Sequence, residues 1–120
     1  NTISYNDAGN YGGGIYCNDS SPFINSNANI SNNKAEINGG GIFILNGSPQ
    51  IKDNWICDNR AFSNGAGIFI MGESSEPEIV DNVRIFGNRS GYIITGENDI
   101  YIESGNPIIN NNGGPPVILP

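Results

Sequence analysis

The sequence contains no histidine, two leucines, five alanines, and five basic residues against twelve acidic ones. Because Ala, Leu, Lys and Glu carry most helices, this composition argues against a helical protein. The net charge of −7 repels a nucleic-acid backbone, so no nucleic-acid partner is expected. The lack of histidine removes the commonest general base. No apolar run is long enough to cross a bilayer, so no transmembrane segment is expected.

Asparagine, isoleucine and glycine are abundant instead, with 21, 20 and 17 copies. Isoleucine is too frequent for a disordered chain, and only 14% of the residues are charged. The same short motifs also return along the chain. Gly-Gly-Gly-Ile at 12–15 recurs at 39–42, and as Gly-Ala-Gly-Ile at 65–68. One proline marks each copy, at Pro22, Pro49, Pro77 and Pro107.

The period of ~27 residues indicates a solenoid. Between turn signals each repeat has room for three short strands, around Ile24, around Ile30 and at 42–44. The prediction is an all-β, single-stranded parallel β-helix of about four and a half coils, with successive coils about 4.8 Å apart. The coils span residues 1–112. The Pro/Gly-rich tail 113–120 either covers the last strand edge or docks on another subunit as a strand, and a short insertion at 90–95 has no assigned role.

Stacking of the repeats places like residues in columns. Apolar columns of the third strand form core ladders, namely Ile15, Ile42, Ile68 and Ile100, and Cys17, Ile44, Ile70 and Ile102. Two asparagine columns at the corners are expected to form hydrogen-bonded ladders, because amide side chains bond up a stack and Asn tolerates left-handed backbone. They are Asn27, Asn54, Asn82 and Asn112, and Asn6, Asn33, Asn59 and Asn88.

Between the two apolar columns of the third strand lies an aromatic column of Tyr16, Phe43, Phe69 and Tyr101. By alternation these rings point away from the core. One interpretation is an exposed binding stripe for sugar faces or a protein surface. The alternatives are that a bulge or loop covers the rings, or that the two faces are exchanged.

Charged residues also recur in columns. Lys34, Arg60 and Arg89 align with Asp7 and are interpreted as a solvated corner. Asp53 and Asp81 share another column, which either faces water or holds calcium with carbonyl and water oxygens. No other cofactor is expected.

Two cysteines and four Asn-x-Ser sequons, at Asn18, Asn29, Asn46 and Asn88, remain. Cys17 falls in the inward column and Cys57 on the outward face of a different coil, so the sequence predicts two free thiols, with an intermolecular bond through Cys57 as the alternative. Among the Asn-x-Ser sequons, Asn18 and Asn46 lie in the turn before Ser-Pro and are candidate glycosylation sites.

The Gly-Gly-x-Ile segments and the Ile-x-x-Asn segments, such as Ile30 to Asn33 and Ile56 to Asn59, resemble the right-handed parallel β-helix repeat family within the pectate-lyase-like superfamily. They look most like the repeats of polymorphic outer-membrane proteins and related surface adhesins. The resemblance covers residues 1 to 112 and implies a right-handed coil. Enzymes of this superfamily cleave polysaccharides and are expected to use Asp clusters with an Arg or a His.

Three functions follow as hypotheses. The first is a non-enzymatic, secreted structural protein whose subunits stack head to tail in an extracellular filament or surface adhesin, because the chain begins within a coil and no cap precedes it. The alternative explanation of that start is that the chain is an excerpt of a longer solenoid. The second is a carbohydrate-binding module that uses the aromatic column. The third, a polysaccharide lyase or hydrolase, depends on Asp53 and Asp81 alone, so catalysis is not expected.

Overall fold

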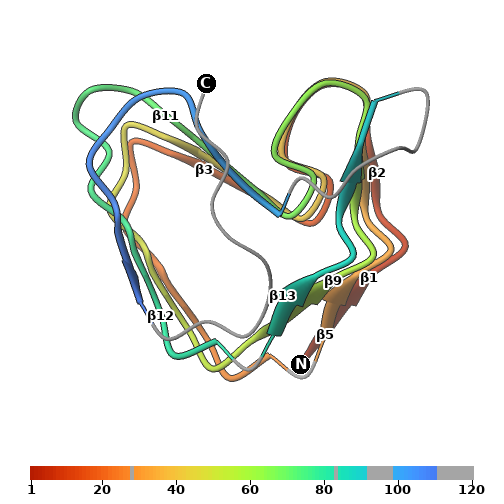
Figure 1. Cartoon of the computed structure of the whole chain (residues 1–120), viewed down its shortest axis with the longest axis horizontal. Coiled ribbons are helices and arrows are strands. Elements are labelled where there is room, and N and C mark those ends of the chain that lie inside the picture. Colours follow the sequence, from red (N-terminus) through yellow and green to blue (C-terminus); the bar gives the residue numbers. More distant parts are fainter. Residues whose placement is uncertain (28, 83, 92–98, 111–120) are drawn as a thin grey trace.

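The protein is a parallel β-solenoid. The computed structural model describes residues 1–27, 29–82, 84–91 and 99–110, and every regular element among them is a β-strand. These strands form four parallel sheets in which neighbours come from successive turns of the chain. Viewed down the axis in Figure 1, the coils lie on top of one another. The all-β, coiled architecture predicted from the repeat is confirmed.

Each sheet takes one strand from each turn of the chain. The first sheet contains β1 (Thr2–Ser4), β5 (Asn29–Ser31), β9 (Trp55–Cys57) and β13 (Arg84–Phe86). The second contains β2 (Asp7–Ala8), β6 (Lys34–Ala35), β10 (Arg60–Ala61) and β14 (Arg89–Ser90). The third contains β3 (Ile15–Asn18), β7 (Ile42–Leu45), β11 (Ile68–Met71) and β15 (Ile100–Ile102). The fourth contains β4 (Phe23–Asn25), β8 (Gln50–Lys52), β12 (Glu78–Val80) and β16 (Ile108–Asn110).

The second sheet corrects the prediction of three strands per coil. Its strands are two residues long, too short to show an alternating pattern in the sequence. They form because the backbone continues to pair between coils after the corner, as in Lys34 N–H donating to Asn6 O at 2.8 Å. The coil therefore has four strands.

Isoleucine side chains fill the interior as predicted. The register pairs Ile15 with Ile42, Ile42 with Ile68, and Ile68 with Ile100. Cys17, Ile44, Ile70 and Ile102 form the adjacent column in the same way. The members in the middle of both columns are fully buried, whereas Ile15 and Ile102 are only partly buried and pack against the core.

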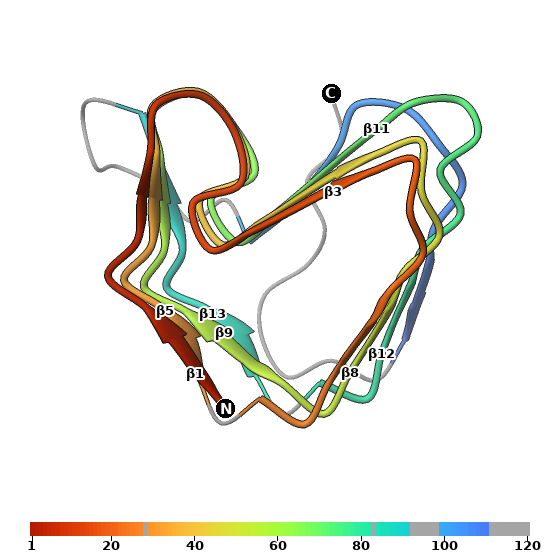
Figure 2. The same ribbon diagram turned by 180° about the vertical axis from the view of Figure 1, so that it is seen from behind.

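The described residues measure 30 × 28 × 24 Å. Seen from behind in Figure 2, the first coil forms one end of the stack, with β1 at its edge. In the described part of the chain no helix has the length and hydrophobicity needed to span a membrane. Asn112, the tail 113–120 and residues 92–95 of the predicted insertion lie outside the described residues.

Candidate functional site

Both asparagine ladders predicted from the sequence exist within the described residues. In the first, Asn27 donates from its backbone N–H and its Nδ2 to Asn54 Oδ1, at 3.1 and 2.9 Å. Asn54 donates in the same way to Asn82 Oδ1, at 3.1 and 3.0 Å. The second ladder runs from Asn6 through Asn33 and Asn59 to Asn88 with the same two bonds at each step.

Each inner ladder amide also reaches backwards along the axis. Asn54 Nδ2 donates to Ile24 O at 2.7 Å, and Asn59 Nδ2 donates to Ile30 O at 2.8 Å. A ladder asparagine therefore satisfies a carbonyl of the preceding coil and a side-chain oxygen of the next one. Since these side chains are buried, the hydrogen bonds remove the cost of burying an amide.

The second ladder ends on a residue that the repeat analysis missed. Asn88 donates from its backbone N–H and its Nδ2 to Asp99 Oδ1, at 3.1 and 2.6 Å. Asp99 directly precedes Ile100, at the position where earlier coils have Gly41 and Gly67. The sequence did contain a signal for this residue, namely an acidic side chain in a column that has glycine in the earlier coils. A carboxylate accepts hydrogen bonds and has no amide to donate onward, so Asp99 terminates this ladder.

The sharp corners are made by the residue before each ladder asparagine, which corrects the role assigned to Asn itself. The left-handed residues are Tyr5, Asn32, Asp58 and Gly87 before one ladder, and Ser26, Asp53 and Asp81 before the other. Their φ values lie between +51° and +68°, a region that Asn, Asp and Gly tolerate better than other residues.

The aromatic column forms a continuous stack of rings outside the isoleucine core. Successive centroids of Tyr16, Phe43, Phe69 and Tyr101 lie 5.3, 5.2 and 5.4 Å apart, and the two central rings are inclined by only 3°. None of these rings belongs to the core cluster. The direction predicted for the column is therefore confirmed.

The prediction of an exposed aromatic stripe is wrong for the two central rings. Phe43 is 1% exposed and Phe69 is 3% exposed, whereas Tyr16 is 49% exposed. The segment between each second-sheet strand and the following third-sheet strand bends inward, as Figure 1 shows, and its glycines lie close to the aromatic column. A Cβ at Gly39 would lie 2.7 Å from the Cβ of Phe43. A loop covers these rings, which was the alternative left open by the sequence.

One ring that the sequence did not single out joins the stack. Tyr11 lies 4.6 Å from Phe43 between centroids and is 40% exposed. Tyr11 and Tyr16 line a shallow hollow together with Ala8, Gly9 and Asn10. The accessible aromatic surface of the column is therefore concentrated at the first coil.

Asp53 and Asp81 lie in one column, as predicted, and both are exposed. Each is the left-handed residue of its corner, at φ +57° and +51°. Among the residues that the structure describes, no three acidic or cysteine side chains are grouped as they would be around a metal ion. Calcium binding by this pair stays a prediction.

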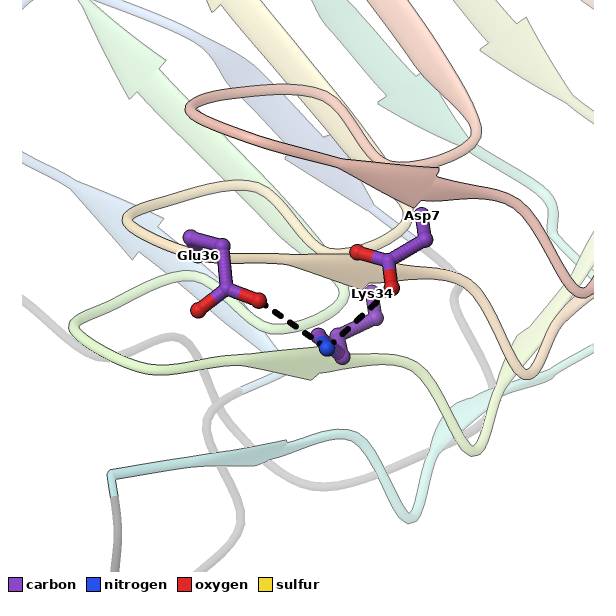
Figure 3. A network of polar contacts seen from close by, with 3 residues as sticks. All are labelled: Asp7, Lys34 and Glu36. Carbon is purple, nitrogen blue, oxygen red and sulfur yellow. Dashed lines mark ion pairs between the residues drawn. The ribbon is translucent and has the colours of Figure 1, made fainter.

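The basic column is in register across the second sheet, from Asp7 through Lys34 and Arg60 to Arg89. Its members differ in their surroundings. Lys34 Nζ lies 3.2 Å from Asp7 Oδ2 and 2.9 Å from Glu36 Oε1, as Figure 3 shows. Hydrogen bonds to Glu36 and then to Asp7 raise the pKa of Lys34. Arg60 lies over the ring of Phe62, and Arg89 is exposed.

Both cysteines are free thiols, as predicted. Cys17 packs within the isoleucine core, and burial raises its pKa. Cys57 pairs with Ser31 and Phe86 outside that core, but it is nearly covered rather than exposed. Burial, followed by the charge of Asp58, raises the pKa of Cys57. The candidate glycosylation residues Asn18 and Asn46 are both exposed, although the register pairs Asn18 with Leu45 and so places the two in neighbouring columns.

The comparison with families of known proteins agrees with this geometry. A family model described as a right-handed beta helix region matches residues 1–84. Comparisons with curated proteins and with solved structures give no match. The match covers more than half of the chain and includes the in-register strands from β1 to β12. The chain therefore belongs to the right-handed beta helix family.

Proposed function

We propose that this protein is a non-catalytic structural module of an extracellular filament or surface adhesin, whose subunits stack head to tail through their coils. The observation that carries the proposal is the register that all coils share. Within the described structure β1, β2, β3 and β4 are the outermost strands of the four sheets. Each is in the same register as the coils inside the stack.

The first strand illustrates how a further coil would pair. Asn1 O accepts from Asn29 N–H, and Tyr5 N–H donates to Ser31 O, so the odd-numbered residues of this segment bond inward to β5. Successive backbone groups of a strand point to opposite sides, so those of Thr2 and Ser4 point away from the stack. Such an edge accepts another parallel strand, and a heterologous contact that does not close produces a filament.

The asparagine ladders have a direction, because each asparagine donates its hydrogen bonds to the asparagine of the next coil. Because Asp99 ends the second ladder without a donor, continuity at that corner would come from backbone pairing rather than from amides. Asp53 and Asp81 support the non-catalytic part of the proposal. Both residues adopt the left-handed backbone of a corner, which explains the presence of Asp there without an enzymatic role. The resemblance to adhesin repeats supports a place outside the cell.

Electron microscopy and light scattering of the purified chain at neutral pH test the proposal. Filaments are expected for the natural sequence. The double variant Thr2→Pro/Ser4→Pro removes two outward N–H groups and should keep the circular dichroism of the fold while losing the filaments. Glu73→Pro, at the second position of an exposed turn closed by Ser75 N–H to Gly72 O, is the matched control. Only monodisperse particles of 12.8 kDa for the natural sequence would contradict the proposal.

A second candidate function, carbohydrate binding, is favoured by the exposed Tyr11 and Tyr16 beside their shallow hollow. Flat rings with an apolar face and a polar hydroxyl suit a sugar surface. Binding on a glycan array should disappear in Tyr11→Ala/Tyr16→Ala. A Tyr5→Ala control removes an aromatic ring that is exposed at a different corner. Absence of binding to every polysaccharide tested would reject this candidate.

A further inference from the structure

Two arginines stand side by side on the second sheet, and neither forms an ion pair with another residue that the structure describes. Arg60 and Arg89 are register partners on β10 and β14, one strand spacing apart. Guanidinium groups stay charged at any physiological pH, and like charges directly opposite one another are destabilising. Lys34, one coil earlier, is held by two carboxylates. Neither Arg60 nor Arg89 has a carboxylate of a described residue within 4.0 Å.

The surroundings of Arg60 and Arg89 form a small hollow at a corner of the coil. Asp58, Asn59 and Gly87 complete its lining. Gly87 is the one corner residue of its column without a side chain, and a Cβ there would lie 3.0 Å from Asp58 Oδ1. The missing side chain leaves space between the corner and the two arginines.

Arg60 is held in position and still has unused hydrogen-bonding capacity. Its guanidinium carbon lies 4.7 Å from the ring centroid of Phe62, which fixes the plane of the group. Its Nε is buried and makes no hydrogen bond to any residue that the structure describes. A buried donor without an acceptor is costly, so a ligand that accepts from the guanidinium edge would be stabilised.

We propose that this corner hollow binds a small oxyanion, the phosphate, sulfate or carboxylate group of a ligand, between the guanidinium groups of Arg60 and Arg89. Planar guanidinium groups offer paired N–H donors that match the oxygens of such groups. Asp58 on the rim repels the anion and therefore limits its affinity. The inference is independent of filament formation, since the hollow lies on the side of the coils and not on the first-coil edge.

Nuclear magnetic resonance titration tests the site with inorganic phosphate, sulfate and acetate as separate probes, at constant ionic strength set with sodium chloride. Saturable shifts are expected at the Arg60 and Arg89 side chains and at the Gly87 amide. Loss of one of two charge-assisted partners in Arg89→Gln should weaken binding by about tenfold. Asp58→Asn should strengthen it. The probe that saturates at the lowest concentration identifies the chemistry of the group.

Arg84→Gln is the matched control, because Arg84 lies on the first sheet over Phe86, with 4.2 Å between guanidinium carbon and ring centroid. The Arg84→Gln variant should bind the probes with the same affinity as the natural sequence. Arg89 is exposed and its replacement leaves the Arg60–Phe62 contact intact, so loss of binding in Arg89→Gln cannot be attributed to loss of folding. Shifts that do not saturate, or equal weakening in Arg84→Gln and Arg89→Gln, would overturn the proposal.

Discussion

Individual asparagines connect three coils of this protein. Asn54 accepts two hydrogen bonds from Asn27, donates to Asn82 and donates backwards to Ile24. No other side chain of this size provides one oxygen acceptor and two N–H donors in a plane. The corner residue before it is left-handed, so each turn needs a corner former followed by an amide.

Asn54→Leu should lower the free energy of unfolding by roughly 1–3 kcal/mol, because the donors of Asn27 and the acceptor oxygens around it lose their buried partner. Urea denaturation followed by circular dichroism measures the change. Asn18→Leu, at an exposed position, is the matched control and should change stability little. Equal destabilisation by the two substitutions would contradict the ladder.

The buried thiol of Cys17 predicts an alkaline loss of stability. Burial raises the pKa of this thiol, so the folded state keeps the proton more strongly than the unfolded state does. The stabilisation is complete below the unfolded pKa and is lost as the pH rises through the folded pKa. Melting temperatures between about pH 8 and pH 10.5 should therefore fall less steeply for Cys17→Val than for the natural sequence. Parallel slopes would be inconsistent with a buried thiol at this position.

At the scale of the element, the glycine segments explain why the aromatic column is covered. Residues 39–41 leave the second sheet, turn at Gly39 with φ +69° and pass close to the neighbouring coil. Gly40 has no space for a side chain, since a Cβ would lie 2.3 Å from Arg60 O and 2.6 Å from Ala66 O. The same segment brings Gly39 against Phe43.

Gly40→Ala should destabilise the protein by about 1–3 kcal/mol, because the added methyl group forces backbone to move in two coils. Gly9→Ala is the matched control, since nothing lies within 4 Å of the Cβ position there. Chemical denaturation of both variants compares them directly. If Gly40→Ala were as stable as Gly9→Ala, the close packing of this segment would be refuted.

The sequence alone predicted the columns in which the same residue type recurs in every coil. It did not predict contacts that depend on how a loop folds over its neighbours. The columns of Ile42 and Asn54 follow from the period, because identical residues must meet when coils stack. The burial of Phe43 depends on how far the glycine loop folds back, which the period does not specify. Asp99 breaks the repeat, and the only sign of its role in the sequence is its place in the column of Gly41 and Gly67.

At the scale of the whole molecule, the coils act as one stack because their register is continuous. Parallel pairing holds through all four sheets of the described residues, and the amide ladders repeat the same offset. Stability should therefore arise mainly between neighbouring coils, as it does in other solenoids. Anything that shifts one coil moves the core, the ladders and the aromatic stack together.

Crosslinking between coils tests this register most directly. Phe23 and Gln50 are outward-facing Cα partners on β4 and β8, whereas Glu78 lies one coil further along the same column. Mild oxidation of Phe23→Cys/Gln50→Cys should give an intramolecular disulfide, because adjacent coils lie about 4.8 Å apart and a bridge spans up to about 7 Å. Phe23→Cys/Glu78→Cys, two coils apart, should stay reduced. Mass spectrometry of the digested protein showing the second bridge and not the first would contradict the stacked coils.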